Sequence, residues 1–333
     1  MKRIAIVTSG GDAPGMNAAV RAATLKAINA GCKVFGVKRG YQGLITGEIV
    51  ELNSMAVSGI LHLGGTILHS ARCPEFKTKE GQEKALANLE IFKIDGLVVI
   101  GGDGSFLGAK DLNKMGFTTI GIPGTIDNDI GCTEMALGFD TAVNTALDAI
   151  NKIRDTAASH DRVYVVEVMG RNAGFIALNA GLAGAAEAIL IPEVEPDLDE
   201  VVKRVKANDV RGRSHSIVVV AEGVFGDPIS GRTLSESSAM RVATYIREKT
   251  GKDTRITILG HIQRGGSPSA VDRLLGTQFG ATAAELLLAG ETGKMVGWNK
   301  SQITVSTMDE SIASGNKIDL SLLELADLLA TTY

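Results

Sequence analysis

Short apolar runs alternate with longer amphipathic stretches along most of the chain. The runs are rich in β-branched residues and nearly continuous, which is typical of strands covered by helices on both faces. The segments expected to form strands are 4–7, 33–37, 97–100, 118–122, 163–168, 188–191, 216–221 and 256–259. The segments expected to form helices are 17–30, 81–93, 141–157, 198–208, 236–250 and 271–289. This alternation predicts an α/β fold with mostly parallel sheets.

Composition narrows the possible functions. A chain of 333 residues suits two domains. A net charge of −4 gives no general attraction to nucleic acid or to an anionic membrane. The apolar run near the start of the chain, residues 4–7, is too short for the hydrophobic region of a signal sequence. No apolar run approaches the length needed to span a membrane. We therefore expect a cytoplasmic protein. Cys32, Cys73 and Cys132 are well separated, which favours small filler residues over a disulfide framework or a zinc site.

Glycines, carboxylates and arginines follow the expected strands. These segments are 8–17, 101–105, 123–129, 169–171, Glu222 and 260–268. Ligands of doubly wound sheets bind outside the carboxyl ends of the strands. The sequence therefore predicts one shared site built from these loops.

Two of the loops have the composition of phosphate-binding turns. Gly10 and Gly11 follow the first strand, and Gly101, Gly102 and Gly104 follow another. Glycine lets the backbone approach a ligand, and the amides of the next helix attract anions. The alternative for either loop is a tight turn without a ligand. Neither loop is a Walker A motif, since the chain has no GxxxxGK[ST] segment.

Carboxylates suggest a magnesium site. Asp127 and Asp129 lie beside Thr125, and Asp103 follows a neighbouring strand. Mg²⁺ is usually held by one or two carboxylates together with nucleotide phosphates. A lone Asp in a turn is more often a cap, but three at two strand exits favour a ligand role.

Basic residues complete the predicted site. The arginines expected at or near these strand ends are Arg72, Arg162, Arg171, Arg255 and Arg264. Guanidinium groups match phosphate in a bidentate manner. His261 is placed to bind a phosphate or sugar oxygen, and its alternative role is to cap the loop. Any one of these arginines, taken alone, is more often a surface charge, but the motifs around Arg171 and Arg264 favour a binding role for these two.

Together these motifs resemble the bacterial ATP-dependent phosphofructokinases. The matching segments, between residue 2 and about residue 300, are TSGGDAPGMNA, SARCPEF, IGGDGS, PGTIDND, IRDTA, VEVMGR, AEG and GHIQRGGSP. The GGDG segment alone also occurs in NAD kinases and lipid kinases. The resemblance implies transfer of the γ-phosphate of Mg-ATP to the 1-hydroxyl of fructose 6-phosphate, the glycolytic step that gives fructose 1,6-bisphosphate and ADP. It also implies two interleaved three-layer α/β domains with mostly parallel sheets. The large ATP-binding domain would comprise 1–138 and about 263–313, and the smaller sugar-phosphate domain 139–262 and about 314–333.

The resemblance also implies roles for individual residues. Asp127 would be the base, Thr125 would hold the phosphoryl group, Arg72 and Arg171 would stabilise its charge, Asp103 would bind Mg²⁺ and Asp129 would support it. The ATP contacts would be Gly11, Arg72, Cys73, Gly102, Asp103, Gly104 and Ser105. The substrate contacts would be Thr125, Ile126, Asp127, Arg162, Met169, Gly170, Arg171, Glu222, Arg255, His261, Ile262, Gln263 and Arg264. Arg162 and Arg255 would come from a neighbouring subunit of a homotetramer.

Donor and regulation can be compared with the family pattern. Related pyrophosphate-dependent enzymes typically carry Asp and Lys where this chain has Gly104 and Gly124, so ATP is the expected donor. The expected binding residues for the effectors ADP and phosphoenolpyruvate are Arg21, Arg154, Ala185, Glu187, Arg211, Arg213 and His215. Leu25, Gly59 and Leu63 replace residues common in the family, which predicts weak or altered regulation.

Three questions stay open from the sequence. The loop 223–237 is longer than in the bacterial enzymes; it either borders the sugar site or is a harmless surface insertion. The donor could be another phosphoryl compound, or the acceptor a related sugar phosphate. A non-catalytic sensor of nucleotide and sugar phosphate is the alternative outside the enzymes, and the intact Asp103, Thr125, Asp127 and Arg171 argue against it.

Overall fold

The computed structural model describes residues 1–213, 215–226 and 236–331. The chain forms two compact units. The first comprises Met1–Thr141 and Arg264–Asn316, and the second comprises Ala142–Gln263 and Lys317–Tyr333. The first boundary falls inside helix α5 (Phe139–Ala157).

A mixed sheet forms the centre of the first unit. Among the described residues its strand order is β11-β10-β5-β4-β1-β2-β3. The neighbours β10–β5–β4–β1–β2 are parallel, and β3 and β11 are antiparallel edge strands. The strands are β1 (Arg3–Thr8), β2 (Lys33–Val37), β3 (Ile49–Leu52), β4 (Gly96–Gly101), β5 (Thr119–Pro123), β10 (Lys294–Asn299) and β11 (Gln302–Thr307).

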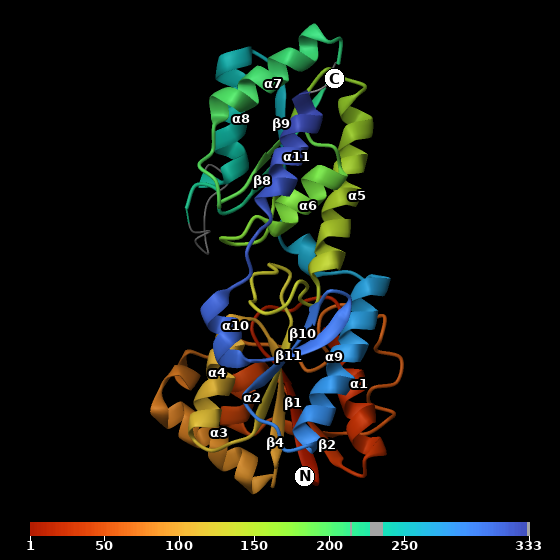
Figure 1. Cartoon of the computed structure of the whole chain (residues 1–333), viewed down its shortest axis with the longest axis vertical. Coiled ribbons are helices and arrows are strands. Elements are labelled where there is room, and N and C mark those ends of the chain that lie inside the picture. Colours follow the sequence, from red (N-terminus) through yellow and green to blue (C-terminus); the bar gives the residue numbers. More distant parts are fainter. Residues whose placement is uncertain (214, 227–235, 332–333) are drawn as a thin grey trace. The chain divides into compact units, whose positions relative to one another are not determined.

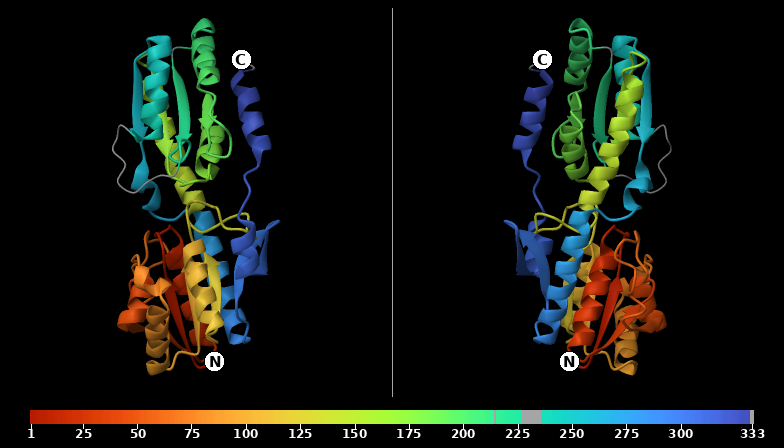
Figure 2. Two further views of the ribbon diagram at one scale, coloured as in Figure 1. Left: turned by 90° about the vertical axis from the view of Figure 1, so that its left-hand side faces the viewer. Right: turned by 90° about the vertical axis from the view of Figure 1, so that its right-hand side faces the viewer.

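Helices cover both faces of this sheet (Figures 1 and 2). On one face α1 (Met16–Asn29) packs closely against α9 (Ala270–Leu288). The helices of the other face are α2 (Gly40–Thr46), α3 (Lys79–Ile91), α4 (Asp103–Lys114) and α10 (Met308–Ser314), together with the 3₁₀ helix η1 (Pro74–Lys77). The first unit is therefore a three-layer α/β structure.

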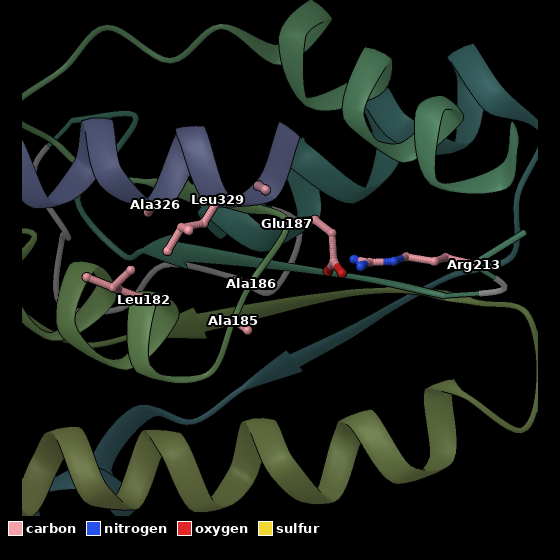
Figure 3. Close-up of a pocket in the computed structure, with 8 residues that line it drawn as sticks. Leu182, Ala185, Ala186, Glu187, Arg213, Ala326 and Leu329 are labelled. Atoms are coloured by element: carbon pink, nitrogen blue, oxygen red, sulfur yellow. The ribbon is translucent and has the colours of Figure 1, made fainter. Parts of the chain in front are cut away.

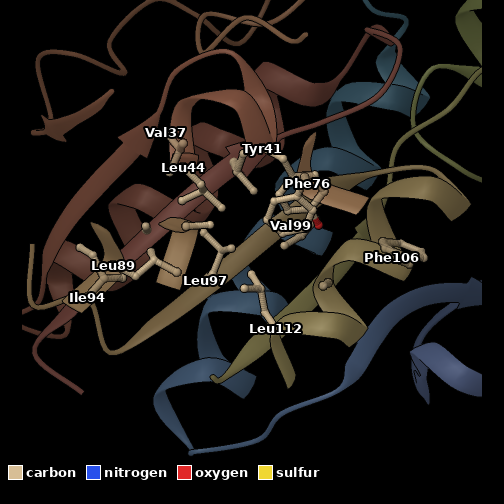
Figure 4. Packing of buried hydrophobic residues seen from close by; sticks show 14 of the residues in the cluster. Val37, Tyr41, Leu44, Phe76, Leu89, Ile94, Leu97, Val99, Phe106 and Leu112 are labelled. Carbon is tan, nitrogen blue, oxygen red and sulfur yellow. The ribbon is translucent and has the colours of Figure 1, made fainter. Parts of the chain in front are cut away.

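Apolar side chains fill the space between the sheet and α2, α3 and α4 (Figure 4). Leu97 and Val99 of β4 face this layer, and Phe106 and Leu112 of α4 pack against it, all with no exposed surface. Burying one such side chain stabilises the fold by about 1.5–3 kcal/mol. Because α4 begins at Asp103, this packing holds the helix N-terminus at the end of β4.

The second unit has a parallel sheet with strand order β7-β8-β6-β9 among its described residues. Its strands are β6 (Val163–Val168), β7 (Ala188–Leu190), β8 (Ser216–Ala221) and β9 (Thr254–Ile258). One face carries α7 (Leu198–Val210) and α8 (Ser238–Thr250), and the other carries α6 (Phe175–Ala183) with α11 (Leu320–Thr331) (Figure 1). Asp197 and Ser237 cap α7 and α8 by accepting hydrogen bonds from Glu200 N and Met240 N.

The structure confirms an α/β fold with mostly parallel sheets. Every strand expected from the sequence is present, although β9 begins two residues before the expected 256. The expectation missed β3, β10 and β11, and it also missed the helices α2, α4, α6, α10 and α11. Of the loop 223–237, residues 227–235 lie outside the described part of the chain. None of the described helices combines the length and apolar character needed to cross a membrane.

Candidate active site

Three neighbouring strands of the first unit end at the same edge of the sheet. The strands β1, β4 and β5 are parallel and adjacent, so their carboxyl ends lie side by side. Loop 9–15 follows β1, the segment 102–105 follows β4, and loop 124–129 follows β5. Hydrogen bonds join the carboxyl ends of these strands: Ser9 N donates to Ile100 O at 2.9 Å, and Gly124 N donates to Gly101 O at 3.0 Å.

The glycines at this edge are needed for close packing of the loops. A Cβ atom on Gly101 would lie 2.3 Å from Ser105 Oγ and 2.5 Å from Ser9 O, which no real side chain tolerates. Gly10 has a φ of 85°, a left-handed conformation that favours glycine. Around Gly104, by contrast, an added Cβ would meet no atom within 4 Å. The first turn of α4 thus borders open space beside a glycine-rich turn. The positive end of a helix in such a place has the chemistry of an anion site.

The acidic residues expected from the sequence gather at the same edge. Asp103 is the first residue of α4, and a Cβ on Gly102 would lie 3.8 Å from Thr125 Cβ, so the two exits touch. Asp127 is 2% exposed, and its backbone N donates to Thr125 Oγ1 at 3.2 Å. Asp129 is partly exposed two residues further on.

Asn128 is a residue of this site that the sequence analysis missed. It has a φ of 54° and is 2% exposed. Its Oδ1 accepts from Ala136 N at 2.8 Å, and its Nδ2 donates to Glu134 O at 3.0 Å. These bonds lock the turn between Asp127 and Asp129. The sequence indicated this turn by an Asn between two Asp residues, because Asn adopts the left-handed conformation more readily than most residues.

Two arginines lie near the glycine-rich loop of the first unit. Arg264 Nη1 donates to Asp12 O at 3.3 Å, and a Cβ on Gly11 would lie 2.6 Å from the same nitrogen. Ser70 Oγ donates a hydrogen bond to Gly10 O, which ties the segment containing Arg72 and Cys73 to this loop. The predicted ATP-binding residues therefore gather at one edge of one sheet.

The predicted sugar-phosphate residues of the second unit also lie at strand exits. Met169, Gly170 and Arg171 follow β6, Glu222 follows β8, and 260–263 follow β9. Glu222 Oε1 accepts from Gly170 N at 3.2 Å and from Arg171 N at 2.9 Å. The backbone is tightly folded here, because a Cβ on Gly223 would lie 2.0 Å from Arg171 O.

Gln263 has a structural contact in this group. Its side chain has no exposed surface, and its Oε1 accepts from Met169 N at 2.8 Å. This bond joins the exit of β9 to the exit of β6. His261 and Ile262, by contrast, are exposed. Arg171 and His261 thus follow two neighbouring strands, β6 and β9, of one sheet.

Arg162 and Arg255 do not lie at the carboxyl edge that the sequence analysis assigned to them. Arg162 directly precedes β6, and Arg255 is the second residue of β9, so both are at the amino ends of their strands. A strand of six residues is about 20 Å long. Arg162 is therefore at the opposite edge of the sheet from Arg171. The assignment to the carboxyl edge was wrong because both arginines directly precede the expected strands 163–168 and 256–259 in the sequence.

The expected effector residues are partly brought together in the second unit. A cavity of about 260 Å³ is lined by Leu182, Ala185, Ala186, Glu187, Arg213, Ala326, Leu329 and Ala330. Figure 3 shows the Glu187 carboxylate and the Arg213 guanidinium facing each other beside apolar walls. Arg154 Nη2 donates to Ala185 O at 2.9 Å. Arg211 and His215 lie on the same stretch of chain as Arg213, whereas Arg21 is on α1 of the first unit.

No group of three or more His, Cys, Asp or Glu residues in the described ranges could by itself hold a metal ion. The expected magnesium site differs from such a cluster, because it combines one or two carboxylates with nucleotide phosphates. Asp103 fits that role through its hard carboxylate oxygens and its place at the N-terminus of α4, next to the open space at Gly104.

Comparisons with known proteins give a consistent result. The family model described as Phosphofructokinase matches residues 3–287. The chain is 52% identical over 331 residues to an ATP-dependent 6-phosphofructokinase of Halothermothrix orenii, covering 99% of this chain and 100% of the relative. It is 53% identical over 330 residues to the protein of the same name from Bacillus licheniformis, with 99% and 100% covered.

Solved structures agree. Phosphofructokinase of Pichia pastoris in the T-state matches with a TM-score of 0.86 and 38% identity over 98% of this chain, which spans 37% of that longer chain. A pyrophosphate-dependent phosphofructokinase of Marinobacter aquaeolei shares the fold, with a TM-score of 0.82, 23% identity, and 98% and 91% of the two chains covered. The chain therefore belongs to the phosphofructokinase family.

Proposed function

We propose that the chain is an ATP-dependent 6-phosphofructokinase that transfers the γ-phosphate of ATP to the 1-hydroxyl of fructose 6-phosphate. The observation that carries this proposal is the meeting of the Gly11 loop, Asp103 and Asp127 at the ends of three adjacent strands. Relatives more than 50% identical along nearly the whole chain carry this name. The reaction belongs to glycolysis, and we propose that the enzyme works in the cytoplasm.

ATP would bind at the edge of the first unit. Gly11 and the segment 102–105 would bind its phosphates, whose oxygens accept hydrogen bonds from backbone amides, helped by the positive end of α4. Arg72 and Cys73, on the segment tied to Gly10, would contact the nucleotide further out. Asp103 would hold Mg²⁺ and Asp129 would support it. When bound, the ion neutralises charge on the phosphates during transfer.

Asp127 would act as the base for the sugar hydroxyl. Its carboxylate would take the proton from the 1-hydroxyl as that oxygen attacks the γ-phosphorus. Thr125, whose hydroxyl accepts from Asp127 N, would hold the phosphoryl group in transit. Arg72 and Arg171 would stabilise the charge that spreads over its oxygens. The near-complete burial of Asp127 would keep competing water away from the reacting atoms.

Fructose 6-phosphate would bind mainly to residues of the second unit. Met169, Gly170 and Arg171 would contact the sugar and the moving phosphoryl group. Glu222 already accepts hydrogen bonds from two of these backbone amides, which supports a preformed loop. The other proposed contacts are Ile126, His261, Ile262, Gln263 and Arg264.

We propose a homotetramer in which Arg162 and Arg255 complete the site of a neighbouring subunit. The support is their position at the amino edge of the sheet, about 20 Å from Arg171 along β6. Arginines at opposite edges cannot both bind one small sugar phosphate within a single chain. A second copy must therefore present them if they bind substrate.

The donor site favours ATP over pyrophosphate. The resemblance implies that pyrophosphate-dependent enzymes typically carry Asp at the position of Gly104. Here that position borders open space, which leaves room for the rest of a nucleotide. Gly124 is more enclosed, since an added Cβ would lie 3.1 Å from Met16 Cε and 3.2 Å from Ile100 Cγ2.

We further propose that the cavity at Glu187 and Arg213 receives the effectors ADP and phosphoenolpyruvate, with weak or altered response. Leu25 on α1 and Leu63, which is 43% exposed, offer no charge to an anion. Loss of one charge-assisted contact costs about 1.5–3 kcal/mol, or about tenfold or more in affinity.

The test is an assay coupled to fructose 1,6-bisphosphate, run with Mg-ATP and with Mg-pyrophosphate. We expect turnover with ATP, loss of activity when EDTA removes the metal, and little turnover with pyrophosphate. Replacing Asp127→Asn should lower kcat by about 10²- to 10⁴-fold. The matched control Asp309→Asn changes an exposed carboxylate of the same unit and should leave kcat unchanged. Activity with pyrophosphate alone would favour the other donor class, and binding of both ligands without product would favour a sensor.

A further inference from the structure

Asp253 joins Arg162 and Arg255 at the amino edge of the second sheet. Arg162 Nε donates to Asp253 Oδ2 at 2.8 Å, and Arg255 Nη2 donates to the same oxygen at 3.0 Å. Neither the sequence motifs nor the proposed roles above include Asp253. It is nevertheless the carboxylate that contacts both of the arginines proposed to serve a neighbouring subunit.

The backbone fixes this arrangement. Asp253 directly precedes β9 and Arg162 directly precedes β6, and these strands are parallel neighbours with Val163 opposite Thr254. Val163 N donates to Asp253 O at 3.1 Å, which brings the two strand starts together. Because side chains two residues apart share a face of a strand, Asp253 and Arg255 point the same way.

Charge explains why a carboxylate is useful at this place. Two guanidinium groups side by side repel each other, and an ionised carboxylate between them removes that repulsion. Partial burial would raise the pKa of Asp253, but hydrogen bonds from Arg162 and Arg255 outweigh burial and hold the pKa below its usual range. The group is therefore ionised at neutral pH, and the three side chains together carry one net positive charge.

The arginines keep donors for a ligand. A guanidinium group has five N–H donors. The hydrogen bonds to Asp253 use one donor of each arginine, and Arg162 also forms a hydrogen bond with Tyr164. The side chain of Arg255 is 55% exposed and that of Arg162 is 29% exposed, so their remaining donors can be reached from outside. A phosphate binds best to such forks when their planes are already oriented.

We propose that Asp253 is a positioning residue that orients Arg162 and Arg255 to bind the phosphate of fructose 6-phosphate in the site of a neighbouring copy of this chain. The inference rests on the proposed function and on the sharing of the site between subunits. Its effect is on substrate binding, because exposed ion pairs contribute little to stability.

The test is the steady-state kinetics of the full-length Asp253→Ala enzyme. We expect the KM for fructose 6-phosphate to rise about tenfold, the effect of disturbing one charge-assisted contact. The KM for ATP and kcat should change less than about twofold, a split that general misfolding would not produce. Asp253→Glu should recover most of the affinity, since it restores the charge.

Asp209→Ala is the matched control. Asp209 is an exposed carboxylate that pairs with Lys252, the residue next to Asp253, and its side chain is 40% exposed against 47% for Asp253. Its removal should leave both KM values unchanged. In an Arg162→Ala and Arg255→Ala background, adding Asp253→Ala should have no further effect on the KM for the sugar phosphate.

The outcomes separate this inference from the proposed function. If the wild-type chain makes no fructose 1,6-bisphosphate, the proposed function fails. If the wild type is active and Asp253→Ala leaves the KM for the sugar unchanged or lowers it, the function stands and Asp253 is not a positioning residue. A parallel rise in both KM values would also overturn the inference, because it would indicate a general effect on folding.

Discussion

At the scale of single residues, Tyr41 links the two segments proposed to bind ATP. Its hydroxyl donates to Ser105 O at 2.5 Å, and its ring stacks on Phe76 with centroids 4.0 Å apart. Phe76 lies on η1, which directly follows Arg72 and Cys73 in the chain, whereas Ser105 lies in the first turn of α4. Tyr41 is 5% exposed, and burial raises its pKa far above the usual value, so it remains a hydrogen-bond donor.

Removing only this hydroxyl should weaken ATP binding. Tyr41→Phe keeps the stacked ring and loses the bond to the Ser105 carbonyl, which is worth about 0.5–1.5 kcal/mol. We expect the KM for ATP to rise about 2- to 10-fold, while the KM for fructose 6-phosphate stays unchanged. Tyr245→Phe, which removes an exposed hydroxyl bonded to Asp199 in the other unit, is the control. Equal KM values for ATP in both variants would contradict a role for Tyr41 in the nucleotide site.

Gly104 should determine which donor is accepted. Because an added Cβ there meets no protein atom within 4 Å, Gly104→Asp should fold normally. Its carboxylate would repel the phosphates of ATP, and we expect the KM for ATP to rise about tenfold or more. Gly104→Asn has the same size without the charge and should be much less affected. The comparison is an ATP titration of both variants at saturating fructose 6-phosphate. Similar values for Asp and Asn would show that charge is not the reason.

Most candidate site residues could be predicted from the sequence, but the residues that contact and position them could not. Strand exits with glycine and carboxylate predicted the loops of Gly11, Asp103 and Asp127, because parallel strands end at a common edge. Tyr41, Asn128 and Asp253 escaped notice. Tyr41 and Asp253 contact Ser105 and Arg162, which are distant in sequence, and no local pattern reports such a contact. Asn128 had a local signal, its place between two Asp residues, that was not used.

At the scale of elements, a buried carboxylate organises the junction of α5 and α9. Asp272 has no exposed surface and accepts from Gly138 N and Thr141 N at 2.8 Å each and from Thr141 Oγ1 at 2.5 Å. Ser269 caps α9 by accepting from Asp272 N. The carboxylate thus satisfies amides at the first turn of α5, which would otherwise be buried without partners.

Replacing this carboxylate should destabilise the first unit. In Asp272→Asn the amide nitrogen cannot accept hydrogen bonds, so at least one buried donor loses its partner. We expect the free energy of unfolding to fall by about 1–3 kcal/mol, measured by urea denaturation. Asp309→Asn, at a side chain that is 66% exposed, should change it by less than about 0.5 kcal/mol. An unchanged midpoint for Asp272→Asn would contradict this account of the junction.

In the first sheet the strands β5, β4, β1 and β2 could be predicted, whereas β10 and the edge strands β3 and β11 could not; in the second sheet all four strands, including the edge strands β7 and β9, could be predicted. The central strands β1, β4 and β8 are continuous apolar runs because helices cover both faces. The edge strand β3 mixes exposed and buried positions, and β11 has only exposed and half-buried ones. Both pair antiparallel with their neighbours, so they lack that signature. Helix α4 was missed because its first turn, DGS, reads as part of a loop while its fold depends on apolar packing behind it.

At the scale of the whole molecule, the proposed active site needs more than one chain. Arg162 and Arg255 lie at the opposite edge of the second sheet from Arg171. The expected strand 163–168 already places Arg162 before the strand and Arg171 after it, and the structure confirms this strand. An enzyme whose site is shared in this way should allow two defective chains to complement each other.

Mixed oligomers should recover activity that neither parent has. Chains carrying Asp127→Asn lack the base, and chains carrying Arg162→Ala lack the phosphate contact given to a neighbour. After joint unfolding and refolding, some oligomers contain an intact Asp127 site served by an intact Arg162. We expect activity at low fructose 6-phosphate well above the sum of the separately refolded parents. Activity equal to that sum would place Arg162 within its own chain's site or outside any site.

The central claim is that Asp127 directs the γ-phosphate of ATP to the 1-hydroxyl of fructose 6-phosphate. The most direct measurement follows ATP labelled with radioactive phosphorus at the γ position, incubated with Mg²⁺, fructose 6-phosphate and the purified chain. We predict that the label appears on the 1-oxygen of fructose 1,6-bisphosphate with the wild type, and at a rate about 10²- to 10⁴-fold lower with Asp127→Asn. Label that stays in ATP, or transfer that is equally fast in both proteins, would contradict the claim.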